Sequence, residues 1–371
     1  MAGSTFGNSF KITTWGESHG KGIGVVVDGC PAGLSLCEED IQVYLNKRKP
    51  GQGKYTTPRQ EGDLVQILSG VFEGKTTGTP ISLVVMNQDQ RSHDYSEIAS
   101  YYRPGHADYT FDAKYGFRDY RGGGRSSGRE TIGRVAAGAI AIKILEQLDI
   151  QITAYTKSIG PVTIENLDFT QIEKNPLRMP DTSAAEKAQI YLDECLRNQD
   201  SSGGVIACQV TGLPAGLGSP VFEKLDANLS KAMFSIGAVK SFEIGAGKQA
   251  AYDVGSHNND ALYVKSPEQT FNQPKVGFQT NYSGGILGGM SNGDTLYMEA
   301  GFKPTPSISS TQDTCNKNGE NIQISIKGRH DPIIVPRAVV VVESMTALVL
   351  VDALFENMSA RMDRIKEFYR M

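Results

Sequence analysis

The chain has 371 residues and a mass of 40.1 kDa, which fits two or three domains or one large domain. Its net charge of −4 argues against a protein that coats nucleic acid, and its apolar content of 39% predicts a folded chain. The five scattered cysteines lack the spacing of a zinc site or a disulfide framework, so we expect no metal. The residues after Met1 do not resemble a signal peptide, and we expect a cytoplasmic protein with free thiols.

Strands and helices alternate irregularly along the chain. Short β-branched runs predict strands at 24–27, 64–68, 81–85, 152–155, 205–210, 295–299 and 322–326. Hairpin-like turns are expected at 76–80 and 292–294. Helical periodicity predicts helices at 131–148, 183–197, 221–234 and 337–369. Hairpins mixed with long helices indicate an α+β fold, and we interpret the polar stretch 168–203 as a surface insertion.

One long apolar run covers residues 338–355. Glu343 and Asp352 interrupt it, and it continues into charged sequence with helical periodicity. This pattern predicts a buried amphipathic helix rather than a membrane span.

The sequence also contains one internal echo. Residues 27–34 and 210–217 agree at six of eight positions, and in both a strand precedes and a helix is expected to follow. We interpret this as two pseudo-repeated halves with a ligand crevice between them. A chance likeness of two strand-to-helix turns explains the echo equally well.

Basic residues are concentrated in two glycine-punctuated segments. Residues 45–59 hold five basic residues and no acid, and residues 103–134 hold seven basic residues and four acids. In an acidic chain, this distribution predicts a local anion site, with phosphate as the leading ligand and a solvated basic face as the alternative.

Within the second segment, Arg-Gly-Gly-Gly-Arg-Ser-Ser-Gly-Arg-Glu occupies 121–130. Ser127 and Glu130 form a capping-box pattern ahead of the helix expected from Thr131. A helix N-terminus flanked by Arg125 and Arg129 would suit a phosphate group. The segment also resembles RNA-binding arginine-glycine sequences, although the helix that follows argues against a disordered tail of that kind.

Two nucleotide-binding motifs are absent from the sequence. Residues 70–76 resemble a P-loop, but only three residues separate the glycines where four are needed, so we interpret them as a strand turn. No Gly-x-Gly-x-x-Gly stands between a strand and a helix, and a Rossmann site is unsupported.

Two histidines lie beside glycines in expected loops. His19 sits in Gly-Glu-Ser-His-Gly at 16–20, and His106 sits in Arg-Pro-Gly-His-Ala-Asp at 103–108. Both are candidates for proton transfer, with ordinary surface histidines as the alternative. Later, Gly-Arg-His-Asp-Pro at 328–332 places a cation beside Asp331, which is either a general base or simply a turn residue.

Taken together, the motifs at 16–20, 103–108, 123–127 and 328–332 resemble those of chorismate synthase, in the same order and along essentially the whole chain. The resemblance implies one domain, 1–371, with a β-α-β sandwich of long helices between two antiparallel sheets, assembled as a homotetramer. It implies conversion of 5-enolpyruvylshikimate 3-phosphate to chorismate and phosphate, the last common step towards aromatic amino acids. This 1,4-trans elimination needs reduced FMN but has no net redox change.

The resemblance also implies roles for individual residues. His19 would act as an acid towards the leaving phosphate, His106 would act beside the flavin, and Asp331 would act near flavin N5 in removal of the ring proton. Substrate phosphate and carboxylate groups, or the phosphate of NADP, would contact Arg48, Lys54, Arg103 and Arg129. Flavin would contact Arg125, Ser126, Ser127, Gly237, Ala238, Gly288, Lys303, Pro304, Thr305, Pro306, Ser307 and Arg329.

Some positions depart from the common family pattern: Lys49 and Lys54 replace arginine, Pro306 replaces serine and Gly128 replaces alanine. Lysine keeps the charge but loses the bidentate fork, so affinity rather than the reaction is in question. No reductase module is visible, and we expect FMN to be reduced from outside, with NADPH as an indirect reductant. We expect a small-molecule substrate and neither nucleic acid nor membrane as partner. The alternative functions are an RNA-binding protein and a flavin oxidoreductase with net redox chemistry.

Overall fold

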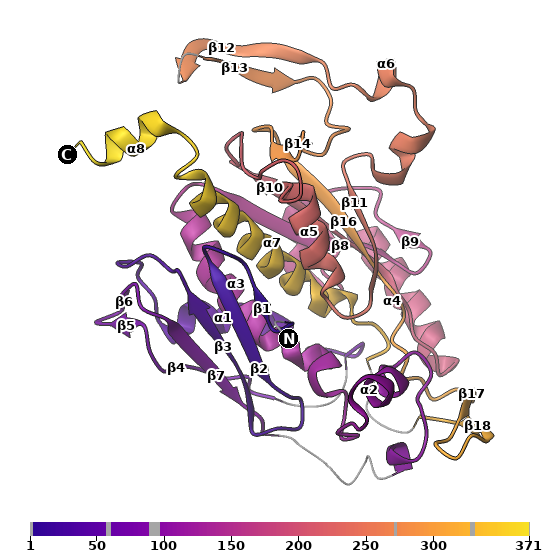
Figure 1. Cartoon of the computed structure of the whole chain (residues 1–371). Coiled ribbons are helices and arrows are strands. Elements are labelled where there is room, and N and C mark those ends of the chain that lie inside the picture. The colour runs from indigo at the N-terminus through magenta and orange to yellow at the C-terminus, as the bar shows by residue number, and fades with distance from the viewer. Residues whose placement is uncertain (1–2, 57–60, 89–96, 271–272, 327–330, 371) are drawn as a thin grey trace.

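Two five-stranded antiparallel sheets lie on either side of a layer of helices (Figure 1). The computed structural model describes residues 3–56, 61–88, 97–270, 273–326 and 331–370. The first sheet has the order β1 (Thr5–Phe6), β2 (Lys11–Gly16), β3 (Gly22–Asp28), β7 (Ile81–Met86), β4 (Val65–Ile67). The second has the order β11 (Val239–Ile244), β16 (Leu296–Phe302), β10 (Gly204–Thr211), β8 (Gln151–Ile159), β9 (Val162–Thr163).

The four remaining strand pairs are small antiparallel hairpins outside these sheets. They are β5 (Val71–Phe72) with β6 (Lys75–Thr76), β12 (Leu262–Thr270) with β13 (Gln273–Phe278), β14 (Ile286–Leu287) with β15 (Met290–Ser291), and β17 (Gln312–Cys315) with β18 (Asn321–Ile324). The β5–β6 hairpin confirms that residues 70–76 form a strand turn and not a P-loop.

The helix layer consists of α1 (Glu38–Arg48), α3 (Thr131–Glu146), α5 (Leu225–Phe234) and α7 (Val335–Asn357). The other helices are α2 (Asp108–Tyr115), α4 (Thr182–Arg197), α6 (Gly255–Asn258) and α8 (Met362–Phe368), with 3-10 turns η2 (Glu97–Ala99), η3 (Gly124–Ser126), η4 (Gly128–Glu130), η5 (Phe169–Lys174) and η6 (Gly247–Tyr252). Because α3 packs on β3 and α7 packs on β8 and β10, the α3–α7 contact joins the two sheets. The expected α+β sandwich is confirmed.

The long apolar helix differs from its prediction. By length and composition alone α7 could cross a membrane, but 72% of its most apolar 18-residue window is buried inside the protein. Its buried residues surround the helix, so α7 is a core helix rather than an amphipathic one. The expected single helix 337–369 is also wrong. It breaks at 358–361, where the chain leaves the sandwich and Arg361 is extended, and α8 follows.

The two expected hairpin turns are wrong in a shared way. Residues 76–80 join β6 to β7, and residues 292–294 join β15 to β16, so each links a small hairpin to a different, larger sheet. Gly78 and Gly293, with φ of +80° and +89°, make these tight turns. A turn sequence shows where the chain reverses but not which strands pair across it.

Corresponding elements occupy the same places in the two sheets. The first sheet contains β2-β3-β7-β4 with helices α1 and α3, and the second contains β8-β10-β16-β11 with helices α5 and α7, in matching chain order. The echo segments share hydrogen bonds as well. The Thr76 hydroxyl donates to Pro31 O at 2.6 Å, and the Ser291 hydroxyl donates to Pro214 O at 2.6 Å. These correspondences support our proposal that the domain consists of two pseudo-repeated halves.

The polar stretch 168–203 lies between β9 and β10 and contains η5 and α4. Leu177 and Met179 are fully buried, and the buried face of α4 joins the main core. The segment therefore contributes to the core, although most of its polar residues face outwards.

Candidate active site

His19 lies in the loop between β2 and β3, against the glycine-rich segment before α3. Its Nδ1 lies 3.0 Å from the Ser18 hydroxyl. A β-carbon on Gly122 would come within 2.4 Å of that same nitrogen, and Gly122 has φ of +75°. Only glycine fits this position without displacing the imidazole.

His106 lies against the predicted flavin loop 303–307. Its Nε2 is 2.9 Å from the Ser307 hydroxyl, and the Lys303 ammonium donates to Gly105 O at 2.9 Å. Burial and the nearby Lys240 lower the pKa of Lys303. The loop 303–307 and His106 are about 200 residues apart in the chain, but they lie together in the structure and form one side of the candidate site.

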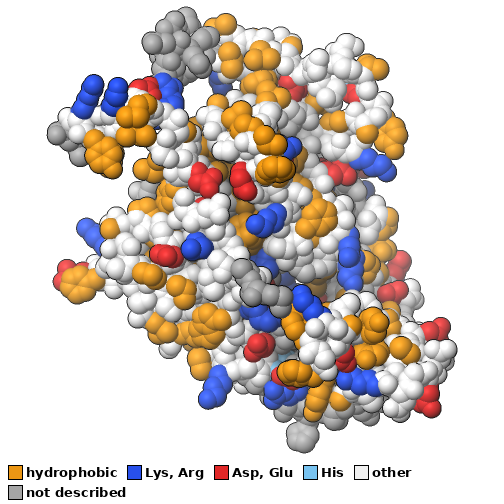
Figure 2. All heavy atoms as spheres, viewed as in Figure 1, with side chains coloured by type: hydrophobic (Ala, Val, Ile, Leu, Met, Phe, Trp, Pro, Cys, Tyr) orange, Lys and Arg blue, Asp and Glu red, His pale blue; other side chains and the backbone are white. Residues whose placement is uncertain are grey.

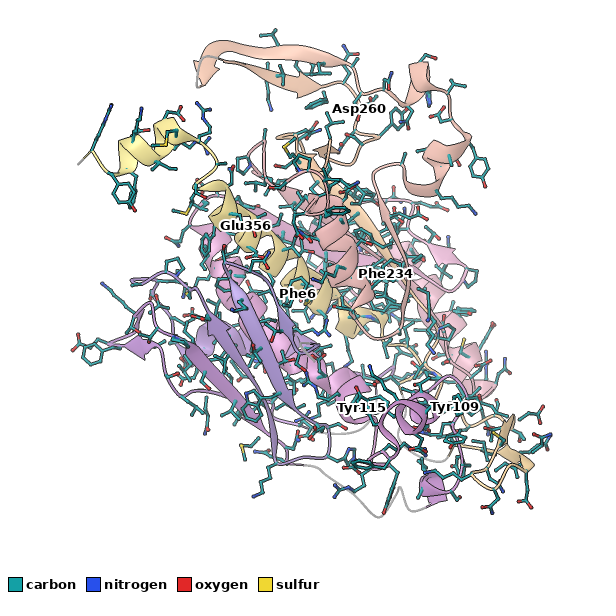
Figure 3. The ribbon with its side chains drawn as sticks, in the orientation of Figure 1. Phe6, Tyr109, Tyr115, Phe234, Asp260 and Glu356 are labelled. Carbon is teal, nitrogen blue, oxygen red and sulfur yellow. The ribbon has the colours of Figure 1, made fainter. Side chains whose placement is uncertain are left out.

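Arg103 connects the surroundings of the two histidines. Its guanidinium binds Asp108 through two hydrogen bonds of 2.8 Å and donates to Gly122 O at 3.4 Å. The Asp108 carboxylate is buried, and its contacts with Arg103 and Arg118 hold its pKa below the ordinary value despite the opposing effect of burial. In Figure 3, α2 extends from this point with the exposed Tyr109 and Tyr115.

Arg48 and Arg129 meet at a buried carboxylate that the sequence analysis missed. Asp63 accepts from Arg48 Nη2 and Arg129 Nη1, both at 2.9 Å, and Glu61 lies 3.4 Å from Arg129. Asp63 and Arg48 are each only 2% exposed. Burial lowers the pKa of Arg48 to about 10, whereas the two guanidiniums outweigh burial at Asp63 and hold its pKa below the ordinary value.

This buried cluster reaches the loop of His19 through Asn87. Arg129 Nε donates to Asn87 Oδ1 at 2.5 Å, and the Asn87 amide donates to the carbonyls of Glu17 and Gly20, at 3.1 and 2.8 Å. Asn87 has no distinctive sequence context, so only the fold reveals its role.

The cluster also reaches Asp331, through Arg337 in the first turn of α7. Arg337 Nη1 donates to Asp331 Oδ2 at 2.7 Å, and its Nε donates to Arg48 O at 3.0 Å. The structure thus connects the loop of His19 with Arg129, Arg48 and Asp331 through a series of side-chain and backbone hydrogen bonds. Arg337 was missed because its neighbours in sequence are apolar, and Asp63 was missed because its context does not mark it as the partner of distant arginines.

The segment 125–130 differs from its prediction. Arg125 donates to Gly16 O and to the Thr14 hydroxyl on β2, at 3.1 and 2.6 Å. The Ser127 hydroxyl accepts from Arg129 N, but the Glu130 carboxylate binds Arg134 instead of completing a capping box. Both guanidiniums therefore bind partners within the protein, and the phosphate cradle expected between them stays a prediction. Ser126 is exposed beside them.

Among the other predicted flavin positions, Ala238 has φ of +73°, and its carbonyl accepts from Lys303 N at 2.9 Å, which brings Gly237 and Ala238 to the loop 303–307. Gly288 lies in the β14–β15 turn at the other end of α5. A helix of ten residues is about 15 Å long, so Gly288 is not brought together with the rest within this chain. Arg329 lies outside the described residues.

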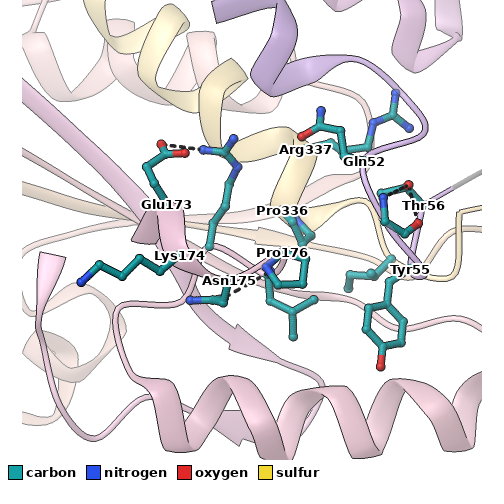
Figure 4. Close-up of a pocket in the computed structure, with 13 residues that line it drawn as sticks. Gln52, Tyr55, Thr56, Glu173, Lys174, Asn175, Pro176, Pro336 and Arg337 are labelled. Carbon is teal, nitrogen blue, oxygen red and sulfur yellow. Dashed lines mark hydrogen bonds and ion pairs between the residues drawn. The ribbon is translucent and has the colours of Figure 1, made fainter. Parts of the chain in front are cut away.

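Lys54 lies apart from the histidines, where its ammonium binds Asp193 of α4 at 2.7 Å. Beside it, a cavity of about 350 Å³ is lined by Gln52, Gly53, Tyr55 and Thr56, by residues 173–178, and by Ile333, Pro336 and Arg337 (Figure 4). Neither His19 nor His106 lines this cavity, but Arg337 does, so the cavity adjoins the buried cluster.

Several residues of the loop 303–307 fit a flavin phosphate or ring. Thr305 Oγ1 is buried and has no hydrogen-bond partner among the described residues, and its backbone carbonyl is held by the Ser201 hydroxyl at 2.7 Å. Lys303 and Ser307 contact the segment of His106, and Thr305 adds a second hydroxyl in the same loop, a donor set that suits a phosphorylated cofactor.

Comparison with known proteins places this site in a family. A family model described as chorismate synthase matches residues 10–355. The chain is 67% identical to the chorismate synthase of Agathobacter rectalis and 66% identical to that of Lachnospira eligens, over all of each chain. A solved structure, "Crystal Structure of Chorismate Synthase", matches with a TM-score of 0.76 and 30% identity, covering 98% of this chain and 96% of that one. The chain therefore belongs to the chorismate synthase family.

Proposed function

We propose that this site converts 5-enolpyruvylshikimate 3-phosphate to chorismate and phosphate by 1,4-trans elimination. The observation that carries the proposal is the hydrogen-bonded chain that joins the loop of His19 to Asp331 through Arg129, Asp63, Arg48 and Arg337. It links two candidate proton-transfer groups with cations suited to a phosphate ester.

Each group has a part that suits its position. His19, held close to the 122–127 segment by Gly122, protonates the leaving phosphate. Arg103 is oriented by two hydrogen bonds to Asp108 and faces the same segment, where it attracts the substrate's anionic groups. Arg48 and Arg129 are buried, so they act by lending positive potential and by fixing the loops around them. Asp331 takes the ring proton.

Reduced FMN is the proposed cofactor, held by Lys303, Thr305 and Ser307, the backbone at Gly237 and Ala238, and the exposed Ser126 next to Ser127. When bound, it supplies electron density that assists departure of the phosphate without net oxidation. His106 lies 2.9 Å from Ser307, where it holds or moves a proton beside the cofactor. Gly288 either contacts the flavin that is bound at the site of a neighbouring subunit or has no contact with flavin.

The remaining features follow from the family. We propose a cytoplasmic homotetramer that relies on an external source of reduced FMN, with NADPH as the indirect reductant. The exposed apolar side chains of Leu262, Tyr263 and Val264 on β12 support self-association.

An anaerobic assay with chemically reduced FMN and 5-enolpyruvylshikimate 3-phosphate tests the reaction. We expect chorismate and phosphate in equal amounts. A second assay with oxidised FMN and NADPH should give no product unless a flavin reductase is added. If FMN binds but neither product forms, the proposed reaction is wrong.

Two substitutions test the proton-transfer roles. We expect His106→Ala and Asp331→Asn each to lower kcat by roughly 10²-fold or more, as the loss of a proton-transfer group does. His257→Ala is a suitable control, because this exposed histidine pairs with Asp253 near α6, away from the loops of the site. Near-normal turnover in either site variant would remove that residue from the mechanism.

A further inference from the structure

Arg337 lies between the candidate base, Asp331, and the buried cluster that contains Arg48. Its guanidinium donates from Nη1 to Asp331 Oδ2 at 2.7 Å and from Nε to the backbone carbonyl of Arg48 at 3.0 Å. The side chains of Arg337 and Asp331 are mostly buried, with 19% and 16% exposed. Their contact is therefore shielded from most of the solvent, unlike a surface ion pair.

The backbone on both sides of this contact is fixed. Pro332 O accepts from Ser202 N at 2.9 Å, which anchors the chain just after Asp331. Arg337 lies in the first turn of α7, where its own amide donates to Ile334 O at 3.1 Å. The carboxylate of Asp331 is therefore oriented by a planar group that itself starts from a rigid helix.

The planar fork of arginine suits this double task. Nη1 of the guanidinium donates to the carboxylate, and Nε donates to the carbonyl of the last residue of α1. The position of Asp331 is therefore fixed relative to the end of α1. Lysine could keep the charge at this place but could not hold both partners in a fixed plane.

We propose that Arg337 is a positioning residue for the elimination: by tying Asp331 to the backbone of Arg48, it holds the carboxylate at the angle and depth needed to take the ring proton. This inference rests on the proposed function of Asp331. It assigns Arg337 no contact with substrate or flavin. A catalytic group that is misplaced by about 1 Å can cost about 10²-fold in rate. The contacts of Arg337 therefore matter more for turnover than for substrate binding.

The test compares Arg337→Gln, Arg337→Lys, Asp331→Asn and the double variant Arg337→Gln/Asp331→Asn. We expect Arg337→Gln to lower kcat by about 10-fold to 100-fold while KM for the substrate and Kd for FMN change less than about three-fold. Arg337→Lys should recover part of the loss. In the Asp331→Asn background, Arg337→Gln should lower kcat by no more than about two-fold further, because the group it positions is already lost.

Arg178→Gln provides a matched control. Arg178 lines the same cavity and forms a comparable pair, Nη1 to Glu173 Oε1 at 2.9 Å, with a side chain that is 11% exposed. We expect this variant to keep normal kcat. An equal loss in Arg178→Gln would mean that any disturbance of the cavity slows the reaction, and would overturn the proposal.

Two other outcomes would also overturn it. If the losses of Arg337→Gln and Asp331→Asn multiply, Arg337 acts independently of Asp331, and only this inference fails. If Asp331→Asn turns over normally, the role of Asp331 in the proposed function fails, and the inference fails with it. If Arg337→Gln is too unstable to assay, Arg337→Lys and its combination with Asp331→Asn give the same comparison.

Discussion

The missing side chain of Gly122 leaves the space that the imidazole of His19, a candidate proton donor, occupies. The imidazole of His19 occupies the space where any β-carbon would lie, 2.4 Å from Nδ1. We expect Gly122→Ala to lower turnover by roughly 10-fold or more, because His19 must move. Gly74 has nearly the same φ, +73°, with no atom within 4 Å of an added β-carbon, so Gly74→Ala separates backbone strain from displacement. Equal activity in the two variants would contradict the assignment.

The Arg48–Asp63 pair makes a second prediction. We expect Arg48→Met to raise KM and also to lower the free energy of unfolding by about 3 kcal/mol, because it leaves the buried Asp63 with one cation fewer. The double variant Arg48→Met/Asp63→Asn should recover much of the stability but not the substrate binding. Urea unfolding and steady-state kinetics measure the two effects. An unchanged KM would count against the phosphate role of Arg48.

Much of this site could be predicted from residue types, but its buried partners could not. Histidines beside glycines and arginines in basic segments have distinctive sequence contexts. Asp63 lies 15 residues from Arg48 and 66 from Arg129, and nothing in its own neighbourhood marks it as their shared partner. Arg125 has a basic, glycine-rich context that predicts a ligand contact, but this context does not reveal that the guanidinium also holds β2.

Among the secondary-structure elements, those with enough residues to show a period were predicted best. Helices α3 and α4 and strands β3, β7 and β10 agree closely with the expected ranges. Strands of two residues carry no alternation, so β1, β5 and β9 could not be recognised. Helix α5 begins at Leu225 rather than at 221. Helix α1 was expected after residues 27–34, but its bounds could not be predicted because its charged and apolar residues are mixed without a clear stripe.

Helix α4 depends on its N-cap, and this dependence varies with pH. The Asp181 carboxylate accepts from the backbone N–H groups of Glu165, Asn166 and Ala184, and these contacts lower its pKa to about 2. A depressed pKa stabilises the folded state above the pKa of the unfolded chain, about 3.9, and the contribution is lost as the pH falls towards 2.

We therefore expect Asp181→Ala to lower the free energy of unfolding by about 1–2 kcal/mol at pH 7. The difference from the wild type should shrink as denaturation is repeated from pH 5 down to pH 3. Asp168→Ala serves as control, because Asp168 caps η5 from an exposed position and should matter less. A difference that stays constant with pH would mean that the carboxylate charge is not responsible.

At the scale of the whole molecule, the β12–β13 hairpin stands away from the sandwich (Figure 1). Apolar side chains are exposed over the upper part of the molecule in Figure 2. On β12, the side chains of Leu262, Tyr263 and Val264 are exposed. If the chain forms the proposed tetramer, such a surface is well suited to contact another copy.

Light scattering after size-exclusion chromatography should give a mass four times the 40.1 kDa of the chain. We expect Val264→Lys to lower this mass, because it places a charge on an apolar surface that is 64% exposed in the single chain. Phe72→Lys is the matched control, since Phe72 is 68% exposed on β5 at a distance from the hairpin. An unchanged tetramer in Val264→Lys would place the contact elsewhere.

The first strands are tied to the last long helix: the Asp352 carboxylate accepts from the amides of Asn8, Ser9 and Phe10, and Asn8 also donates to Glu356. During synthesis on the ribosome, the second sheet emerges before α7, the helix that packs on β8 and β10. The apolar face of this sheet is therefore incompletely covered until α7 is made, and chaperones would bind it in that interval. A chain stopped before residue 335 would carry every strand that the structure describes, yet it would have neither a closed core nor a working site.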